Sequence, residues 1–279
     1  MKKTALLALC LCAPLIIGES RAQDFSAAIS SSSPQAQKSW TGFYSGLNIG
    51  YGWANQTANY GSEFRLPPRV PAFTGVSWSL ESPLAEGFSG GAQLGYNYQV
   101  TGTGAVLGAE VDIQGSGMSG ASSGLGTYNT RRIYFPFVQN AQSLNWYGTV
   151  RARVGYAFLP QLLIYGTGGF AYGGGANSFS VLYSDLKEYG GSSATYANPG
   201  WTAGGGVEWA LWNNWTVKSE YLYLNLGSTP NLTAQQHCTC SVLPDYFMAN
   251  HSGGANRYHV IRVGANYHFN FCDISKIAR

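Results

Sequence analysis

The feature that most constrains this chain is a repeated alternation of apolar and polar side chains with a period of two, which indicates strands. It is clearest in FYSGLNIGYGW, where Phe43, Leu47, Ile49 and Trp53 share one face. Seven further segments alternate in this way, and most are about ten residues or slightly longer, the length of a tilted strand that crosses a bilayer. The expected strands are 40–53, 87–99, 105–114, 143–158, 162–173, 200–211, 215–226 and 257–269.

The links between these segments alternate in length. Short links (VTGTG, LPQ and WNN) follow the second, fourth and sixth segments. Long links follow the first, third, fifth and seventh segments, at 54–86, 115–142, 174–199 and 227–256. Short turns at one end and long loops at the other are typical of an up-and-down outer-membrane barrel. The sequence therefore predicts an all-β fold, an eight-stranded antiparallel up-and-down transmembrane β-barrel over 40–271.

Charged residues are scarce, at 10% of the chain, and their positions test this prediction. When apolar residues set the phase of each strand, the charged residues of the strand cores all fall on the opposite, inner face. These residues are Glu110, Asp112, Arg151, Arg153, Glu208, Lys218, Glu220 and Arg262. A basic side chain on the lipid face at the bilayer midplane costs roughly 2–4 kcal/mol, which inward placement avoids. Four acids and four bases can pair, so we expect a lumen charge network in which Arg151 and Arg153 neighbour Glu110 and Asp112.

Other inward and outward residues fit the same barrel. Leu222 and Leu224 fall on the inner face against the pattern, and we place them near the loop end. Inward glycines leave room for long lumen side chains, because an eight-stranded interior is just wide enough to be filled by side chains. Tyr and Trp near strand ends suit the two interface girdles of such barrels. These aromatic residues are Trp53, Tyr98, Trp146, Trp209, Trp215 and Tyr267.

The beginning of the chain is predicted to be a secretory signal. Lys2 and Lys3 precede an apolar run that is too short to span a membrane, and Ser20-Arg21-Ala22 provides small residues for cleavage after about Ala22. Residues 1–22 are therefore the expected signal peptide, and the Ser- and Gln-rich residues 23–39 a flexible leader. Cleavage would leave a net charge of +1 and no basic cluster with interleaved aromatics, so nucleic acid is not an expected partner.

Five motifs together resemble a known family. WTGFYSGLNIGYGW, GAEVDIQGSG, VRARVGYAF, GWTAGGGVEWALWNNWTVKSEYLYLNLG and VIRVGANYHF are similar to the outer-membrane β-barrel proteins that include surface antigens and haemin-binding proteins of alpha-proteobacteria. The resemblance runs from Trp40 to Phe269 and implies an OmpA-like barrel of the porin family in the cell outer membrane. It carries no catalytic residues. It also implies that barrel-assembly machinery reads the strand end near Phe269, which leaves 272–279 as a short periplasmic tail.

Two motifs raise the question of a bound ligand. GSGMSG at 115–120 has dinucleotide-binding spacing, but no helical periodicity follows it, so we expect a surface loop. His237, Cys238, Cys240 and His251 could hold haem or a metal through imidazole and thiolate groups. The alternative is a pair of loop thiols without a ligand, and we expect no cofactor.

The expected function is a structural or surface role, with outer-membrane lipid as a partner and four long extracellular loops available for interaction. A narrow porin-like channel is an alternative, although porins with aqueous channels have 16–18 strands. A second alternative is binding of haem or a host or partner molecule through the loop 227–256. His251 next to Ser252 does not form a nucleophile–base pair with an orienting acid, so we expect no enzyme activity.

Overall fold

The structure is a computed structural model that describes residues 39–54, 60–61, 79–80, 83–125, 137–183, 188–212, 214–236, 247–251 and 254–269. The predicted signal peptide, the leader before Ser39 and the tail 272–279 lie outside these residues, so their boundaries stay predictions. No helix within the described residues is long and apolar enough to cross a membrane.

Eight long antiparallel strands form a closed barrel, which confirms the predicted fold class. They are β1 (Gly42–Ala54), β4 (Glu86–Gln99), β5 (Ala105–Leu125), β6 (Phe137–Leu159), β7 (Leu162–Tyr183), β8 (Glu188–Trp212), β9 (Trp215–Ser228) and β12 (Ala255–Phe269). Two small hairpins lie in the long links: β2 (Tyr60–Gly61) with β3 (Ser79–Leu80), and β10 (Leu232–Gln236) with β11 (Phe247–His251).

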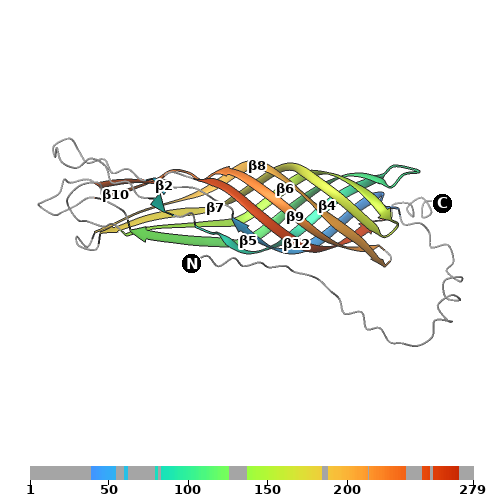
Figure 1. Ribbon diagram of the computed structural model, residues 1–279, viewed down its shortest axis with the longest axis horizontal. Coiled ribbons are helices and arrows are strands. Elements are labelled where there is room, and N and C mark those ends of the chain that lie inside the picture. The colour runs from blue at the N-terminus through green and yellow to red at the C-terminus, as the bar shows by residue number, and fades with distance from the viewer. Residues whose placement is uncertain are drawn as a thin grey trace, which may run out of the picture. The chain divides into compact units, whose positions relative to one another are not determined.

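Each barrel strand pairs with its neighbours along the chain, and β1 pairs with β12 to close the ring. The closing seam runs from Phe43 opposite Phe269 to Ala54 opposite Tyr258. The turn end of the barrel contains the short links, among them 100–104, where Gly102 has a φ of 77° that suits glycine. The loop end is the opposite end, where β5–β8 project past their neighbours (Figure 1).

The strands β5–β8 are longer than the sequence predicts. We expected β5 to end at 114 and β7 at 173, but the hairpin pairing continues to Leu125 and Tyr183. The segment 115–120 is therefore part of a strand, with a bulge between Gly115 and Met118, and is not the predicted loop. The apolar alternation stops before the strands do, since a sheet that projects beyond lipid needs no apolar outer face.

The outer and inner faces differ as predicted. Outward apolar side chains are widely exposed, as with Leu47 at 70% and Ile49 at 64%. Aromatic rings gather near both ends of the barrel. They include Tyr98, Trp209, Trp215 and Tyr267 towards the turn end, and Trp53, Trp146, Trp201 and Tyr223 towards the loop end. Because every strand of the ring is paired on both sides, the barrel has no open sheet edge where it crosses the bilayer.

Two apolar clusters occupy the inside of the barrel at different heights. The turn-end cluster contains Trp40, Val106, Leu163, Tyr165 and Ala210. The loop-end cluster includes Met118, Leu144, Tyr147, Leu222, Leu224, Leu226, Tyr258 and Val260. The inward leucines that broke the predicted pattern thus belong to this second cluster. The charged residues lie between the two clusters, so the lumen is filled in three successive layers.

Candidate functional site: a charge network in the lumen

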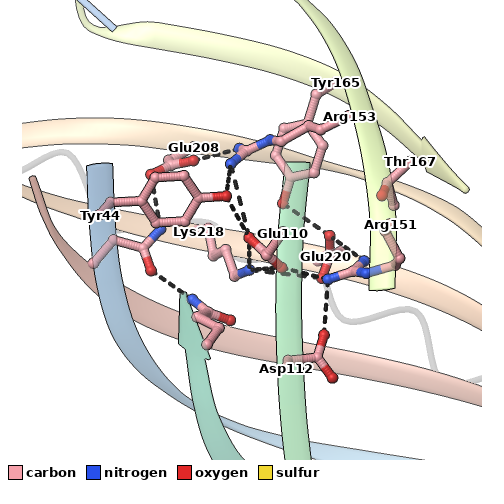
Figure 2. A network of polar contacts seen from close by, with 12 residues as sticks. Tyr44, Glu110, Asp112, Arg151, Arg153, Tyr165, Thr167, Glu208, Lys218 and Glu220 are labelled. Carbon is pink, nitrogen blue, oxygen red and sulfur yellow. Dashed lines mark hydrogen bonds and ion pairs between the residues drawn. The ribbon is translucent and has the colours of Figure 1, made fainter. Parts of the chain in front are cut away.

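The eight charged residues named from the sequence meet inside the barrel. Figure 2 labels all of them except Arg262. They come from five strands, β5, β6, β8, β9 and β12, and each occupies an inward position of the two-residue period. None of the eight is more than 5% exposed. Burial of this degree is costly for a charge unless oppositely charged groups and hydrogen bonds compensate it.

Glu110 on β5 is the centre of the network. Its Oε1 atom accepts a short hydrogen bond from Arg151 and is 2.9 Å from Nζ of Lys218 and 3.4 Å from Nη2 of Arg262. Its Oε2 atom accepts a hydrogen bond of 2.7 Å from the Tyr44 hydroxyl. One carboxylate therefore connects β5 with β1, β6, β9 and β12.

Arg151 and Arg262 are each held by three carboxylates, those of Glu110, Glu220 and Asp112. Nη1 of Arg151 donates to Glu220 at 2.9 Å, and Nε of Arg262 donates to the same carboxylate at 2.7 Å. Both guanidinium groups also donate to Oδ2 of Asp112 at 3.0 Å. The two like charges are therefore bridged by shared acids.

Arg153 forms a second part of the network, nearer the turn end. It makes a short contact with Glu208 on β8, and its guanidinium carbon lies 3.5 Å from the centroid of the Tyr165 ring, a cation–π arrangement. Its Nη1 donates to the Tyr44 hydroxyl at 3.1 Å, which links it to the Glu110 centre. Nδ2 of Asn266 donates to the other Glu208 oxygen at 2.8 Å.

The neutral partners of the network are not among the residues predicted from the sequence. These hydroxyl and amide groups occupy the same inward phase as the charged residues, and that phase is the signal by which they could be predicted. They are Tyr44, Thr149, Tyr165, Thr216 and Asn266. The four acids and four bases balance one another in charge, and the neutral groups add further hydrogen bonds to the network.

The predicted ligand residues of the loop 227–256 are not brought together in the described structure. His237, Cys238 and Cys240 lie outside the described residues, as does the side chain of His251, which ends β11. Within the described part of the chain, no group of three His, Cys, Asp or Glu side chains could hold a metal ion. Haem or metal ligation by this loop stays a prediction.

Comparison with known proteins identifies the family to which this barrel belongs. Residues 25–269 match the family model described as "Outer membrane protein beta-barrel domain". The chain belongs to the outer-membrane protein β-barrel family. A relative, the 31 kDa outer-membrane immunogenic protein of Brucella melitensis, is 38% identical over 241 residues, which cover 83% of this chain and 84% of that protein. A 22 kDa outer membrane protein of Rhizobium leguminosarum is 36% identical over 142 residues, which cover 51% of this chain and 54% of that protein.

The chain is also similar to solved structures of outer-membrane proteins. OprG of Pseudomonas aeruginosa is similar at 10% sequence identity with a TM-score of 0.40, covering 84% of this chain and 99% of that one. The family assignment confirms the predicted location in the cell outer membrane. In such barrels short turns face the periplasm and longer loops the outside, so we expect the turn end to be periplasmic and the loop end extracellular.

Proposed function

We propose that this outer-membrane barrel is a closed scaffold that presents a projecting sheet and its loops at the cell surface. The observation that carries the proposal is the filling of the lumen in three layers, with the charge network between two apolar clusters. Such an interior favours rigidity over conduction, because an ion would have to displace paired charges and packed apolar groups. The family is known for membrane barrels and not for catalysis, so we propose no enzymatic activity.

The projecting part of β5–β8 supports a surface role. Above the membrane most of its outward side chains are small and uncharged, with the exposed Phe137 and Leu182 as exceptions where β6 and β7 pair at the loop end. Shallow depressions on it are lined by residues such as Gln139, Ala141, Ser178 and Ser193. Its inner side is buried, with Asn140 and Phe179 no more than 1% exposed. The barrel thus continues outside the bilayer as an ordered platform from which loops can contact other molecules.

Conductance measurement in planar bilayers tests the closed lumen. We expect the purified barrel to give no sustained current under conditions in which a wide porin conducts. Reproducible single-channel steps from the wild-type barrel would contradict the proposal and favour the narrow channel instead. Arg151→Ala with Arg153→Ala gives an internal comparison, because removal of two long side chains from the network is expected to increase any residual leak.

Surface binding of haem by the loop 227–256 is a separate proposal, based on its imidazole and thiol groups. A haemin titration monitored by absorbance would compare wild type with the double variant His237→Ala/His251→Ala. Binding by wild type that is lost in the variant supports ligation by these residues. Equal binding by both proteins, or none by either, removes the proposed ligands.

A final proposal concerns assembly. Strand β12 ends on Phe269, whose ring contacts Tyr267 on the same outward face at a centroid distance of 5.3 Å. We propose that the barrel-assembly machinery recognises this aromatic strand end. Phe269→Ala is then expected to slow membrane insertion, whereas Phe43→Ala on the adjacent strand end leaves the rate unchanged.

A further inference from the structure

Two charged side chains of the described strands face outward. They are Glu86 on β4 and Arg257 on β12, and both are exposed at the extracellular end of a strand that pairs with β1. Arg257 makes no ion pair within the described part of the chain. An outward cation costs roughly 2–4 kcal/mol at the bilayer midplane but only about 0–1 kcal/mol near the interface, so Arg257 suits the headgroup level.

An aromatic cluster lies immediately below Arg257 on the same face. Trp53, His259 and Tyr223 are consecutive in one row across β1, β12 and β9. The His259 ring stacks on Trp53 with a centroid distance of 5.6 Å and meets the edge of Tyr223 at 5.3 Å. We call Trp53, Tyr221, Tyr223 and His259 the outer aromatic cluster.

The outer aromatic cluster is held in one arrangement. The Tyr221 hydroxyl lies 2.5 Å from Nδ1 of His259, so the imidazole is fixed by a hydrogen bond as well as by three ring contacts. Tyr and Trp rings at the membrane interface have an apolar body and a polar edge, and they suit groups that are themselves part apolar and part polar. A rigid aromatic surface with a cation above it is a recognisable binding arrangement.

We propose that Arg257 and the outer aromatic cluster bind the anionic sugar headgroup of an outer-leaflet glycolipid. The guanidinium presents planar donors that match a phosphate or carboxylate in a bidentate fashion. The exposed ring of Tyr221 and the partly exposed rings of Trp53 and Tyr223 offer apolar surface against which a sugar can pack. The outer leaflet of the outer membrane surrounds this site, so the ligand is present at high local concentration.

A negative charge on the other side of β1 indicates over which strands the headgroup lies. Glu86 lies in the same row as Trp53 and His259, but on the β4 side, where its carboxylate repels an anion. Asn225 lies opposite Arg257 on β9 and extends the polar surface on the β12 side. The headgroup is therefore expected over β12 and β9. This inference depends on the orientation of the outer face and not on whether the lumen conducts.

The test measures lipid binding by the full-length folded barrel in detergent micelles. The probes are bisphosphorylated lipid A, the same lipid A without its phosphates, and phosphatidylglycerol. The proteins are wild type, Arg257→Gln, Arg257→Lys and the matched control Glu86→Gln, which changes an exposed charge at the same end of the barrel. An unboiled gel sample of each protein verifies that it is folded before binding is measured.

We expect Arg257→Gln to weaken binding of bisphosphorylated lipid A about tenfold, the effect of losing roughly one charged hydrogen bond. Arg257→Lys is expected to fall between this variant and wild type, and Glu86→Gln to bind as tightly as wild type or more tightly. Wild type should bind the dephosphorylated probe and phosphatidylglycerol more weakly. Equal affinity of wild type and Arg257→Gln overturns the proposal. Equal affinity of wild type for all three probes also overturns it, because it shows no selection of an anionic sugar.

Discussion

Arg151 and Arg153 are two residues apart on β6, yet they enter different parts of the lumen network. Arg151 lies directly opposite Glu110 in the β5–β6 register, and this is the pairing expected from the sequence. Arg153 instead reaches Glu208 on β8, past the intervening strand β7. Phase along a strand can be predicted from apolar residues, but contacts across the lumen depend on the stagger of the strands, which the sequence pattern does not contain.

Replacement of Arg151 by leucine is expected to destabilise the barrel strongly. The change removes one cation from contact with Glu110, Asp112 and Glu220, which leaves their charges undercompensated in a buried site. Loss of one partner of a buried ion pair costs about 3–5 kcal/mol. The measurement is the temperature at which the folded band disappears on a detergent gel.

The control for this variant restores charge balance. Arg151→Leu combined with Glu220→Gln removes one base and one acid, so its unfolding temperature is expected to lie between those of wild type and Arg151→Leu. An unfolding temperature of Arg151→Leu equal to that of wild type would show that the lumen charges contribute little to stability.

Glycine at inward positions is required for the same network. A Cβ atom on Gly206 would lie 2.5 Å from the Ser219 carbonyl oxygen and 2.8 Å from the Tyr165 hydroxyl. Gly206→Ala is therefore expected to displace Tyr165 from Arg153 and to cost about 1–3 kcal/mol of unfolding free energy, as overpacking does. Urea titration of the folded fraction in detergent measures this cost.

Gly166 is the matched control, because it faces outward and a Cβ atom there would meet nothing closer than 3.9 Å. Gly166→Ala should leave the stability unchanged or raise it slightly. If both alanine variants were equally stable, the space beside Gly206 would not be filled as tightly as the structure shows.

Among the elements, β5–β8 differ most from what the sequence predicts. Their membrane part was recognisable because lipid requires apolar outward residues and the lumen requires polar inward ones. Beyond the bilayer this requirement ends, and the outward positions of the Ser-, Gly- and Asn-rich segments are mostly small or polar although the backbone pairing continues. Pro199 is compatible with this extension because β8 has no β9 partner above Trp201.

Hydrogen exchange can distinguish this projecting sheet from the loops that the sequence predicts. Residues 138–144 of β6 pair with β5 on one side and β7 on the other, so their amides should exchange slowly. Residues 120–124 of β5 pair with β6 but not with β4, so alternate amides should exchange faster. Exchange of 138–144 within seconds would contradict the paired structure.

At the scale of the whole molecule, the number of strands, their phases and the location in the outer membrane were all predictable. They depend on the thickness and polarity of the bilayer, which act on every strand alike. The layering of the lumen was only partly predictable. The inward positions of Leu222 and Leu224 indicated an apolar layer near the loop end. The turn-end cluster around Trp40 could not be predicted from the sequence, because its members come from separate segments of the chain.

A closed ladder of eight strands should resist denaturation as one unit. We therefore expect unboiled protein to migrate differently from boiled protein on a detergent gel, with a single folded band converting to a single unfolded band on heating. Identical mobility of the two samples, together with recovery of the protein from the periplasmic fraction, would contradict a membrane barrel.

The seam between β1 and β12 has a consequence for how the barrel forms. All other strand pairs join segments that follow one another along the chain, whereas this pair joins the two ends of the ring. Tyr44 on β1 and Arg262 on β12 both contact Glu110 on β5, so the carboxylate gains its last partners only when the ends meet. Ring closure therefore completes the contacts of the central carboxylate. We expect an unclosed ring to leave Glu110 without its full set of partners, which favours the closed state.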